Sequence, residues 1–223
     1  MNYAAAFTDF FKHPKWVTSL LLAGVCCLIP IAGAMVVIGW LISGFWVRTE
    51  NSYETFPPFA FDNFGAKLER GLIPVVVGLV IGIGGSIVLG IPLVIVSFAA
   101  AATKSVAIIL LVSFAMRIVT SVIVFTLMRP FTLRASLLQD FGKAFDFNYA
   151  KRFLSLMWKE LLISSVILAI LGIVIGFVVC IGWILGPPLF CFAWGHLDKQ
   201  IYNLYLARGG EPMGLSPKLA GIV

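Results

Sequence analysis

Charge is what this sequence has least of. Asp, Glu, Lys and Arg together make up 12% of its 223 residues, whereas soluble domains carry about 25%. Apolar residues make up 61% of the chain, and its mean hydropathy is +1.04. A chain so poor in ions cannot cover a water-facing surface, so the composition excludes an ordinary soluble globular domain.

Patterns of catalytic and metal-binding residues are missing as well. The sequence contains no GxSxG, no HExxH and no phosphate-binding glycine loop outside an apolar run. No Asp lies away from the ends of an apolar run, which excludes a pair of intramembrane catalytic aspartates. The cysteines lie inside apolar runs without the spacing of metal ligands; they are Cys26, Cys27, Cys180 and Cys191. We therefore expect no enzyme activity, no cofactor and no metal.

The net charge of +6 does not predict a nucleic-acid partner. The Lys and Arg residues cluster beside the apolar runs, where they anchor a chain to anionic lipid on the cytoplasmic side of a membrane. The partners that we expect are the lipid bilayer, an anionic lipid, and a membrane protein or a second copy of this chain.

What the sequence does have is long uncharged runs, which extend from Trp16 to Val47, from Gly71 to Thr103 and from Leu161 to Leu197. Each is longer than the roughly 20 residues that cross the hydrocarbon layer as a helix. The sequence thus predicts an all-α, polytopic transmembrane helical bundle, with residues 1–223 forming one integral membrane domain. Pro30, Pro92, Pro187 and Pro188 are expected to interrupt its spans.

The number of crossings depends on where these runs turn. The run beginning at Gly71 splits near residues 102–104, and the last run splits near residues 180–182. The first run either turns between Pro30 and Gly33 or forms one long kinked helix. The two alternatives give six crossings, arranged as three hairpins, or five crossings.

The distribution of charge favours six crossings. In that topology all of the 16 Lys and Arg residues except Lys104 and Arg117 lie on the side of the N-terminus, as the positive-inside rule requires. We expect a prokaryotic plasma membrane with both termini cytoplasmic. The cytoplasmic side then carries two substantial connections, residues 48–70 and 129–159, as the main surface for a partner.

A weak repeat precedes the three runs. Residues 6–12, 60–67 and 144–151 each combine aromatic side chains, an Asp and a Lys. Such segments are typical of short amphipathic helices that lie at the membrane interface. We expect one before each hairpin.

Arg117 is the candidate binding residue, because it lies near the middle of the predicted span from Ser105 to Met128. An arginine at that depth costs about 3 kcal/mol. Ser113 and Ser121 share its helix face and Thr120 lies beside them, but no acidic residue lies deep in a span. The missing carboxylate predicts a site for an anion or a lipid headgroup.

Small residues recur every four positions in the third predicted span. They let another helix approach closely. The candidate packing positions are Gly78, Gly82, Ser86 and Gly90 in this span, and Gly172 and Gly176 in the last hairpin.

At the end of the last span, His196, Asp198 and Gln200 are polar, and we interpret them as interfacial anchors.

The chain resembles the DUF4013 family of prokaryotic multi-pass membrane proteins of unknown function. The matching segments are loose: Phe11 to Trp16, Leu28 to Ile31, Gly39-Trp40, Phe56 to Asp62, Ala144 to Asp146, and Leu197 to Tyr202. The doubled Pro57-Pro58 departs from the single Pro of the family pattern. The resemblance implies a multi-pass helical fold and supplies no activity and no catalytic residue.

For function, the sequence favours a non-catalytic scaffold or an accessory subunit of a membrane complex, because a pathway across the bilayer would need polar residues at several depths. The alternative is a small transporter or a lipid- or anion-handling protein that uses Arg117.

Overall fold

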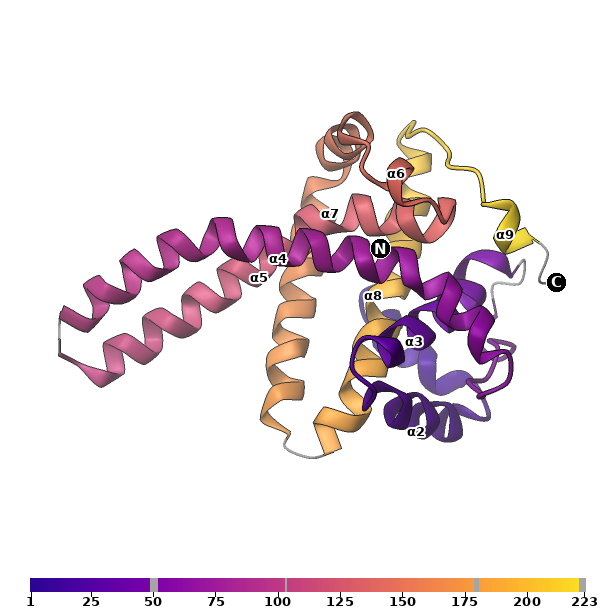
Figure 1. The fold of residues 1–223 in the computed structure, drawn as a ribbon, viewed down its shortest axis with the longest axis horizontal. Helices are drawn as coiled ribbons and strands as arrows, with labels where there is room; N and C mark the ends of the chain where they lie inside the picture. Colours follow the sequence, from indigo (N-terminus) through magenta and orange to yellow (C-terminus); the bar gives the residue numbers. More distant parts are fainter. Residues whose placement is uncertain (49–51, 103, 179–180, 221–223) are drawn as a thin grey trace.

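The computed structural model describes residues 1–48, 52–102, 104–178 and 181–220, and every regular element in these ranges is helical. Figure 1 shows a compact body from which one long hairpin projects. The body contains α1 (Ala5–Thr8), η1 (Asp9–Lys12), α2 (Trp16–Cys27), α3 (Ala32–Ile42), η2 (Ser43–Val47), α6 (Phe141–Ala144), α7 (Phe147–Phe177), α8 (Ile181–Ala207) and α9 (Pro217–Ala220). The projecting hairpin contains α4 (Phe64–Ala102) and α5 (Val106–Leu138). The prediction of an all-α fold is confirmed.

The first apolar run forms two short helices. Residues 28–31 turn between α2 and α3, and Ile31 adopts a positive φ of 63° there. Gly33 packs so closely on α2 that a Cβ would overlap the Cys26 carbonyl. A single kinked helix, which the alternative with five crossings required, is therefore wrong. Six crossings are not confirmed either, because three of the described helices are long and apolar enough to cross a membrane. At 12 and 11 residues, the two helices are about 18 and 16 Å long, which is shorter than a ~30 Å hydrocarbon layer.

The hairpin of α4 and α5 turns where the sequence predicted, between Ala102 and Val106, although Thr103 lies outside the described residues. We call its distal part, on either side of this turn, the arm. The arm extends past the body in a direction different from that of the α7–α8 hairpin (Figure 1). The most hydrophobic 18-residue window of α4 has 0% of its residues buried, and that of α5 has 6%.

The last apolar run also forms a hairpin, since α7 ends at Phe177 and α8 begins at Ile181. Of the predicted turn at residues 180–182, Cys180 lies outside the described residues, and residues 181 and 182 belong to the first turn of α8. Asp146 caps the first turn of α7, where its side chain accepts a hydrogen bond of 3.0 Å from the Tyr149 backbone N–H. A carboxylate at this position stabilises a helix start by satisfying one of its free N–H groups.

Two boundaries differ from the sequence prediction. The helix α5 continues ten residues beyond Met128, through Pro130 to Leu138, so most of the predicted connection 129–159 is helical. Proline also lies inside α4 at Pro74 and Pro92 and inside α8 at Pro187 and Pro188, and none of these ends its helix. Of the four predicted interruptions, only Pro30 lies between helices.

The first of the two predicted connections, residues 48–70, folds partly into the core. Phe56 and Phe59 are 5% and 1% exposed, in a core with Trp40 of α3 and Phe192 of α8. The Trp40 indole N–H donates to the Pro57 carbonyl at 2.8 Å. Phe56 and Phe59 therefore anchor this connection in the core of the body, while Phe61, Asp62 and Asn63 remain exposed.

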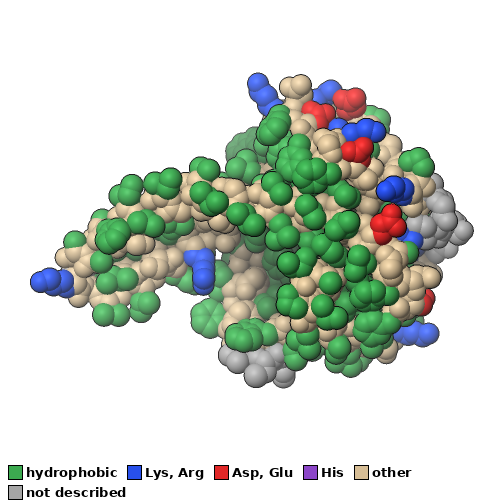
Figure 2. All heavy atoms as spheres, viewed as in Figure 1, with side chains coloured by type: hydrophobic (Ala, Val, Ile, Leu, Met, Phe, Trp, Pro, Cys, Tyr) green, Lys and Arg blue, Asp and Glu red, His purple; other side chains and the backbone are tan. Residues whose placement is uncertain are grey.

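Within the described ranges, three helices are long and apolar enough to cross a membrane: α4, α5 and α7. Figure 2 shows hydrophobic side chains over the arm and much of the body, with the acidic and most of the basic side chains along one rim of the body. The chain thus has the features of an integral membrane protein.

Candidate functional site

A buried ion pair joins the two halves of the body. Arg129 of α5 is 1% exposed, and its Nε lies 3.3 Å from an Asp198 carboxylate oxygen of α8. Arg129 also donates from Nη1 to the Ser164 hydroxyl of α7 at 2.6 Å, and its guanidinium lies 4.9 Å from the Trp194 ring centroid. One guanidinium therefore connects three helices.

A second polar contact continues this seam. The Thr126 hydroxyl of α5 donates to the Ser165 hydroxyl of α7 at 3.0 Å. Ser164 and Ser165 are both completely buried. In hydrocarbon, hydroxyl pairs between helices satisfy groups that lipid cannot, so the α5–α7 interface is fixed by specific polar contacts.

The sequence placed Arg129 in a surface connection because an Arg–Pro pair after an apolar run resembles a membrane exit. The structure shows it inside the protein. Asp198 was interpreted as an interfacial anchor, and it is 7% exposed. Arg129 and Asp198 are each a charged residue at the end of an apolar run. This position is the sequence signal that they share, and it does not indicate that they pair with each other.

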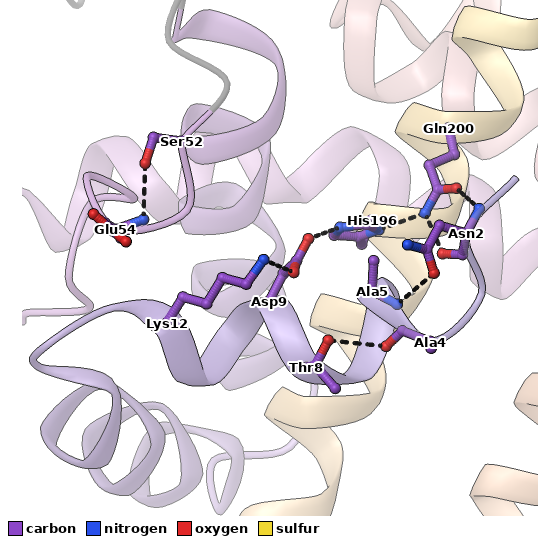
Figure 3. Close-up of polar contacts among 10 residues, drawn as sticks. All are labelled: Asn2, Ala4, Ala5, Thr8, Asp9, Lys12, Ser52, Glu54, His196 and Gln200. Carbon is purple, nitrogen blue, oxygen red and sulfur yellow. Dashed lines mark hydrogen bonds and ion pairs between the residues drawn. The ribbon is translucent and has the colours of Figure 1, made fainter.

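A second network fastens the N-terminal segment onto α8 (Figure 3). Asp9 forms an ion pair with Lys12 at 2.7 Å through one carboxylate oxygen, and its other oxygen lies 3.0 Å from His196 Nε2. The second ring nitrogen, Nδ1, lies 2.9 Å from the Gln200 amide nitrogen. Gln200 also exchanges two hydrogen bonds with the backbone of Asn2, of 2.7 and 2.9 Å.

These contacts fix the role of His196. The Gln200 amide can only donate, so Nδ1 accepts and Nε2–H donates to Asp9. Both nitrogens are therefore engaged in holding the N-terminal segment on α8. Tyr53 stacks on the ring with centroids 4.9 Å apart, and burial raises the pKa of the Tyr53 hydroxyl to about 12, so that it stays protonated at neutral pH.

Arg117 lies exposed on α5, in a groove of about 470 Å³ between α5 and α7. Ser121, Gly172 and Gly176 line the same groove. Ser113 and Thr120 are not among its lining residues. The groove thus brings together Arg117, one of its predicted hydroxyl neighbours and two of the predicted packing glycines. Among the described residues, no hydrogen bond or ion pair joins Arg117 to another side chain.

The predicted packing positions on α4 lie in the part of the helix that leads into the arm. A Cβ at Gly78 would make ordinary contacts with Met128 and Thr132, and one at Gly82 or Gly90 would meet nothing within 4 Å. Ser86 is exposed. On α7, a Cβ at Gly172 would touch Phe190 at 3.8 Å, and Gly176 is open. Close helix approach instead occurs between Gly39 of α3 and Gly71 of α4, where a Cβ would overlap the facing backbone.

No group of three or more His, Cys, Asp or Glu side chains that could hold a metal ion is found within the described ranges. The cysteines of these ranges are unpaired thiols, and Cys180 lies outside the described residues.

A family model matches residues 22–183: it is DUF4013, described as a protein of unknown function. The match covers the arm, Arg117 and Arg129, and it ends before the part of α8 that carries His196 and Asp198. No curated protein and no solved structure matches the chain.

Proposed function

The chain belongs to the DUF4013 family, and on that premise we propose that it is a non-catalytic scaffold or accessory subunit of a membrane complex. In this proposal the body holds the chain in the plasma membrane with both termini cytoplasmic, and the arm binds a transmembrane helix of a partner protein.

The observation that carries this proposal is the arm itself. Two long apolar helices leave the body together, and almost none of the residues in their apolar stretches is fully buried by the rest of the chain. Lipid can cover such helices, but lipid gives no reason for the row of small residues at positions 82, 86 and 90 of α4. Small residues let two helix backbones approach closely, and this row has no such neighbour in the chain itself.

The buried polar groups of the body support the same proposal. Arg129 is paired with Asp198, and His196 with Asp9 and Gln200. Each pair joins elements of the fold to one another. A body held together by these contacts is a suitable support for an arm that binds a partner protein.

The test is affinity purification in a mild detergent. We expect a membrane protein to co-purify with the wild type and to be lost from the double variant Ser86→Leu/Gly90→Leu, because two leucines fill the row of small residues. Gly84→Leu is the matched control, since Gly84 is equally open and lies on another side of α4. Co-purification of the same protein with the double variant would contradict the proposal, and recovery of this chain alone as a larger oligomer would identify a second copy as the partner.

A second candidate function is favoured by the groove at Arg117. A guanidinium beside Ser121 in a groove of about 470 Å³ fits the phosphate of an anionic lipid, because Arg binds phosphate through paired N–H donors. In this alternative the chain handles a lipid or another anion at Arg117.

This alternative predicts a difference in bound lipid. We expect Arg117→Leu to co-purify with less anionic lipid than the wild type, and Arg117→Lys to retain most of it because the charge remains. Lipid extraction and mass spectrometry of the purified proteins measure the difference. Equal amounts on the wild type and on Arg117→Leu would rule out the site.

A further inference from the structure

A second cavity lies inside the body, away from Arg117. It has a volume of about 400 Å³ and is half open, and it is enclosed by α3, η2, α4, α5 and α8. Ligand pockets span about 300–1,000 Å³, so the cavity is large enough for a small ligand. Its walls are mainly apolar, with Trp46, Phe125 and Trp194 among them.

The few polar groups of the cavity lie at one end. On α5 the lining runs from Val124 and Phe125 at the apolar end to Thr132 and Ser136 near the end of the helix. The carboxylate of Asp198 belongs to the polar end, because its partner Arg129 lies one turn before Thr132 on α5. The other end of the cavity is lined by Gly82 of α4, on the side of the arm. A Cβ at Gly82 would meet nothing within 4 Å.

The polar end offers hydrogen-bond acceptors. The Thr132 hydroxyl donates to the Met128 and Arg129 carbonyls at 3.2 Å, and the Ser136 hydroxyl donates to the Thr132 carbonyl at 2.8 Å. With their protons used within α5, both oxygens present lone pairs. Asp198 is 7% exposed, contacts Arg129 through one oxygen and accepts a hydrogen bond from the Trp194 side chain. A carboxylate has about four acceptor positions, so Asp198 retains others.

Arg129, the cation of this region, is not among the lining residues of the cavity. Its Nη1 donates to Ser164, its Nε lies 3.3 Å from Asp198 and its plane lies over the Trp194 ring, while Nη2 is buried without a hydrogen bond. A ligand in this cavity therefore meets acceptors at its polar end, whereas a ligand in the groove at Arg117 meets a cation.

We propose that this cavity binds a single-chain amphiphile whose headgroup donates hydrogen bonds, namely an uncharged hydroxyl or an ammonium group. The headgroup lies against Asp198, Thr132 and Ser136, and the hydrocarbon chain runs along Gly78 and Gly82 toward the arm. A headgroup that carries only acceptors, such as a carboxylate, would face the Asp198 charge with no donor to offer. The cavity shares Gly82 with the row of small residues on α4, but Ser86, Gly90 and Arg117 are not among its lining residues.

The test is native mass spectrometry of the purified protein with three probes of the same chain length: monoolein, oleylamine and oleic acid. We expect one equivalent of monoolein or oleylamine to be retained, and the pair tells a hydroxyl headgroup from an ammonium one. Oleic acid should bind about tenfold more weakly, because a buried acceptor left without a donor reduces affinity.

Two variants localise the binding. Gly82→Leu should abolish retention of the probe, because the leucine fills the apolar end of the cavity. Gly90→Leu is the matched control on the same helix, since Gly90 is equally open but does not line the cavity, and it should bind as the wild type does. Equal binding of all three probes, no binding of any probe, or undiminished binding by Gly82→Leu would overturn the proposal.

Discussion

Arg129 and Asp198 show what one pair of charges does in a chain with so few. Both side chains are buried, and they join α5 to α8 at 3.3 Å. A buried ion pair contributes little net stability compared with an apolar replacement, because both charges lose their hydration. Removing one member is different, since the other charge then remains buried without a counter-ion. The pair therefore favours the packing of α5 on α8 in which both charges are neutralised.

We predict that Arg129→Met destabilises the protein by about 3–5 kcal/mol, because the Asp198 carboxylate is left alone in the core. The double variant Arg129→Met/Asp198→Leu should recover most of that loss. Equilibrium unfolding of the three proteins in mixed detergent micelles measures both effects. A single variant as stable as the wild type, or a double variant no better than the single one, would argue against a structural pair.

At the scale of the elements, the closest approach of two helices occurs where α3 crosses α4. Gly39 faces the Lys67 carbonyl and Gly71 faces the Met35 carbonyl, and neither site has room for a Cβ. This crossing sets the direction in which α4 leaves the body. Glycine thus has two roles on α4, since Gly71 makes the crossing whereas Gly82, Gly84 and Gly90 have nothing within 4 Å of a Cβ.

We predict that Gly71→Ala lowers stability by at least about 1–3 kcal/mol, the usual cost of overpacking, because the facing backbone must move. Gly65→Ala, a few residues earlier in α4 with nothing within 4 Å of the new Cβ, should be neutral or slightly stabilising, since alanine favours a helix. Thermal unfolding in one detergent compares them. Equal behaviour of the two variants would show that the crossing is not tight.

The elements also show how far the sequence predicts this fold. The turns of both long hairpins follow from run length and flanking residues, as does the separation of α2 from α3 near Pro30. The end of α5 was missed because Arg129 and Pro130 are typical of a helix leaving the membrane, and only the distant Asp198 and Ser164 make burial of that arginine favourable. The groove at Arg117 joins residues of α5 and α7, and helix periodicity cannot predict contacts between helices.

For the whole molecule, the main feature is the division between a body fixed by polar contacts and an arm that exposes large apolar side chains. The rim of charged side chains in Figure 2 lies on the body. The arm has large apolar side chains on all sides, with Ile87, Ile91 and Ile95 each 65% exposed. Such a surface is stable when hydrocarbon surrounds it, and the scaffold role depends on this placement.

The most direct measurement is the environment of a nitroxide attached to the arm at Val94→Cys, in protein reconstituted into lipid vesicles after Cys26, Cys27, Cys180 and Cys191 are replaced by alanine. Oxygen dissolves in the hydrocarbon, and a charged nickel chelate stays in water. We predict that oxygen relaxes the label far more strongly than the chelate does. Strong relaxation by the chelate would place the arm in water and contradict the account of this chain as an integral membrane protein.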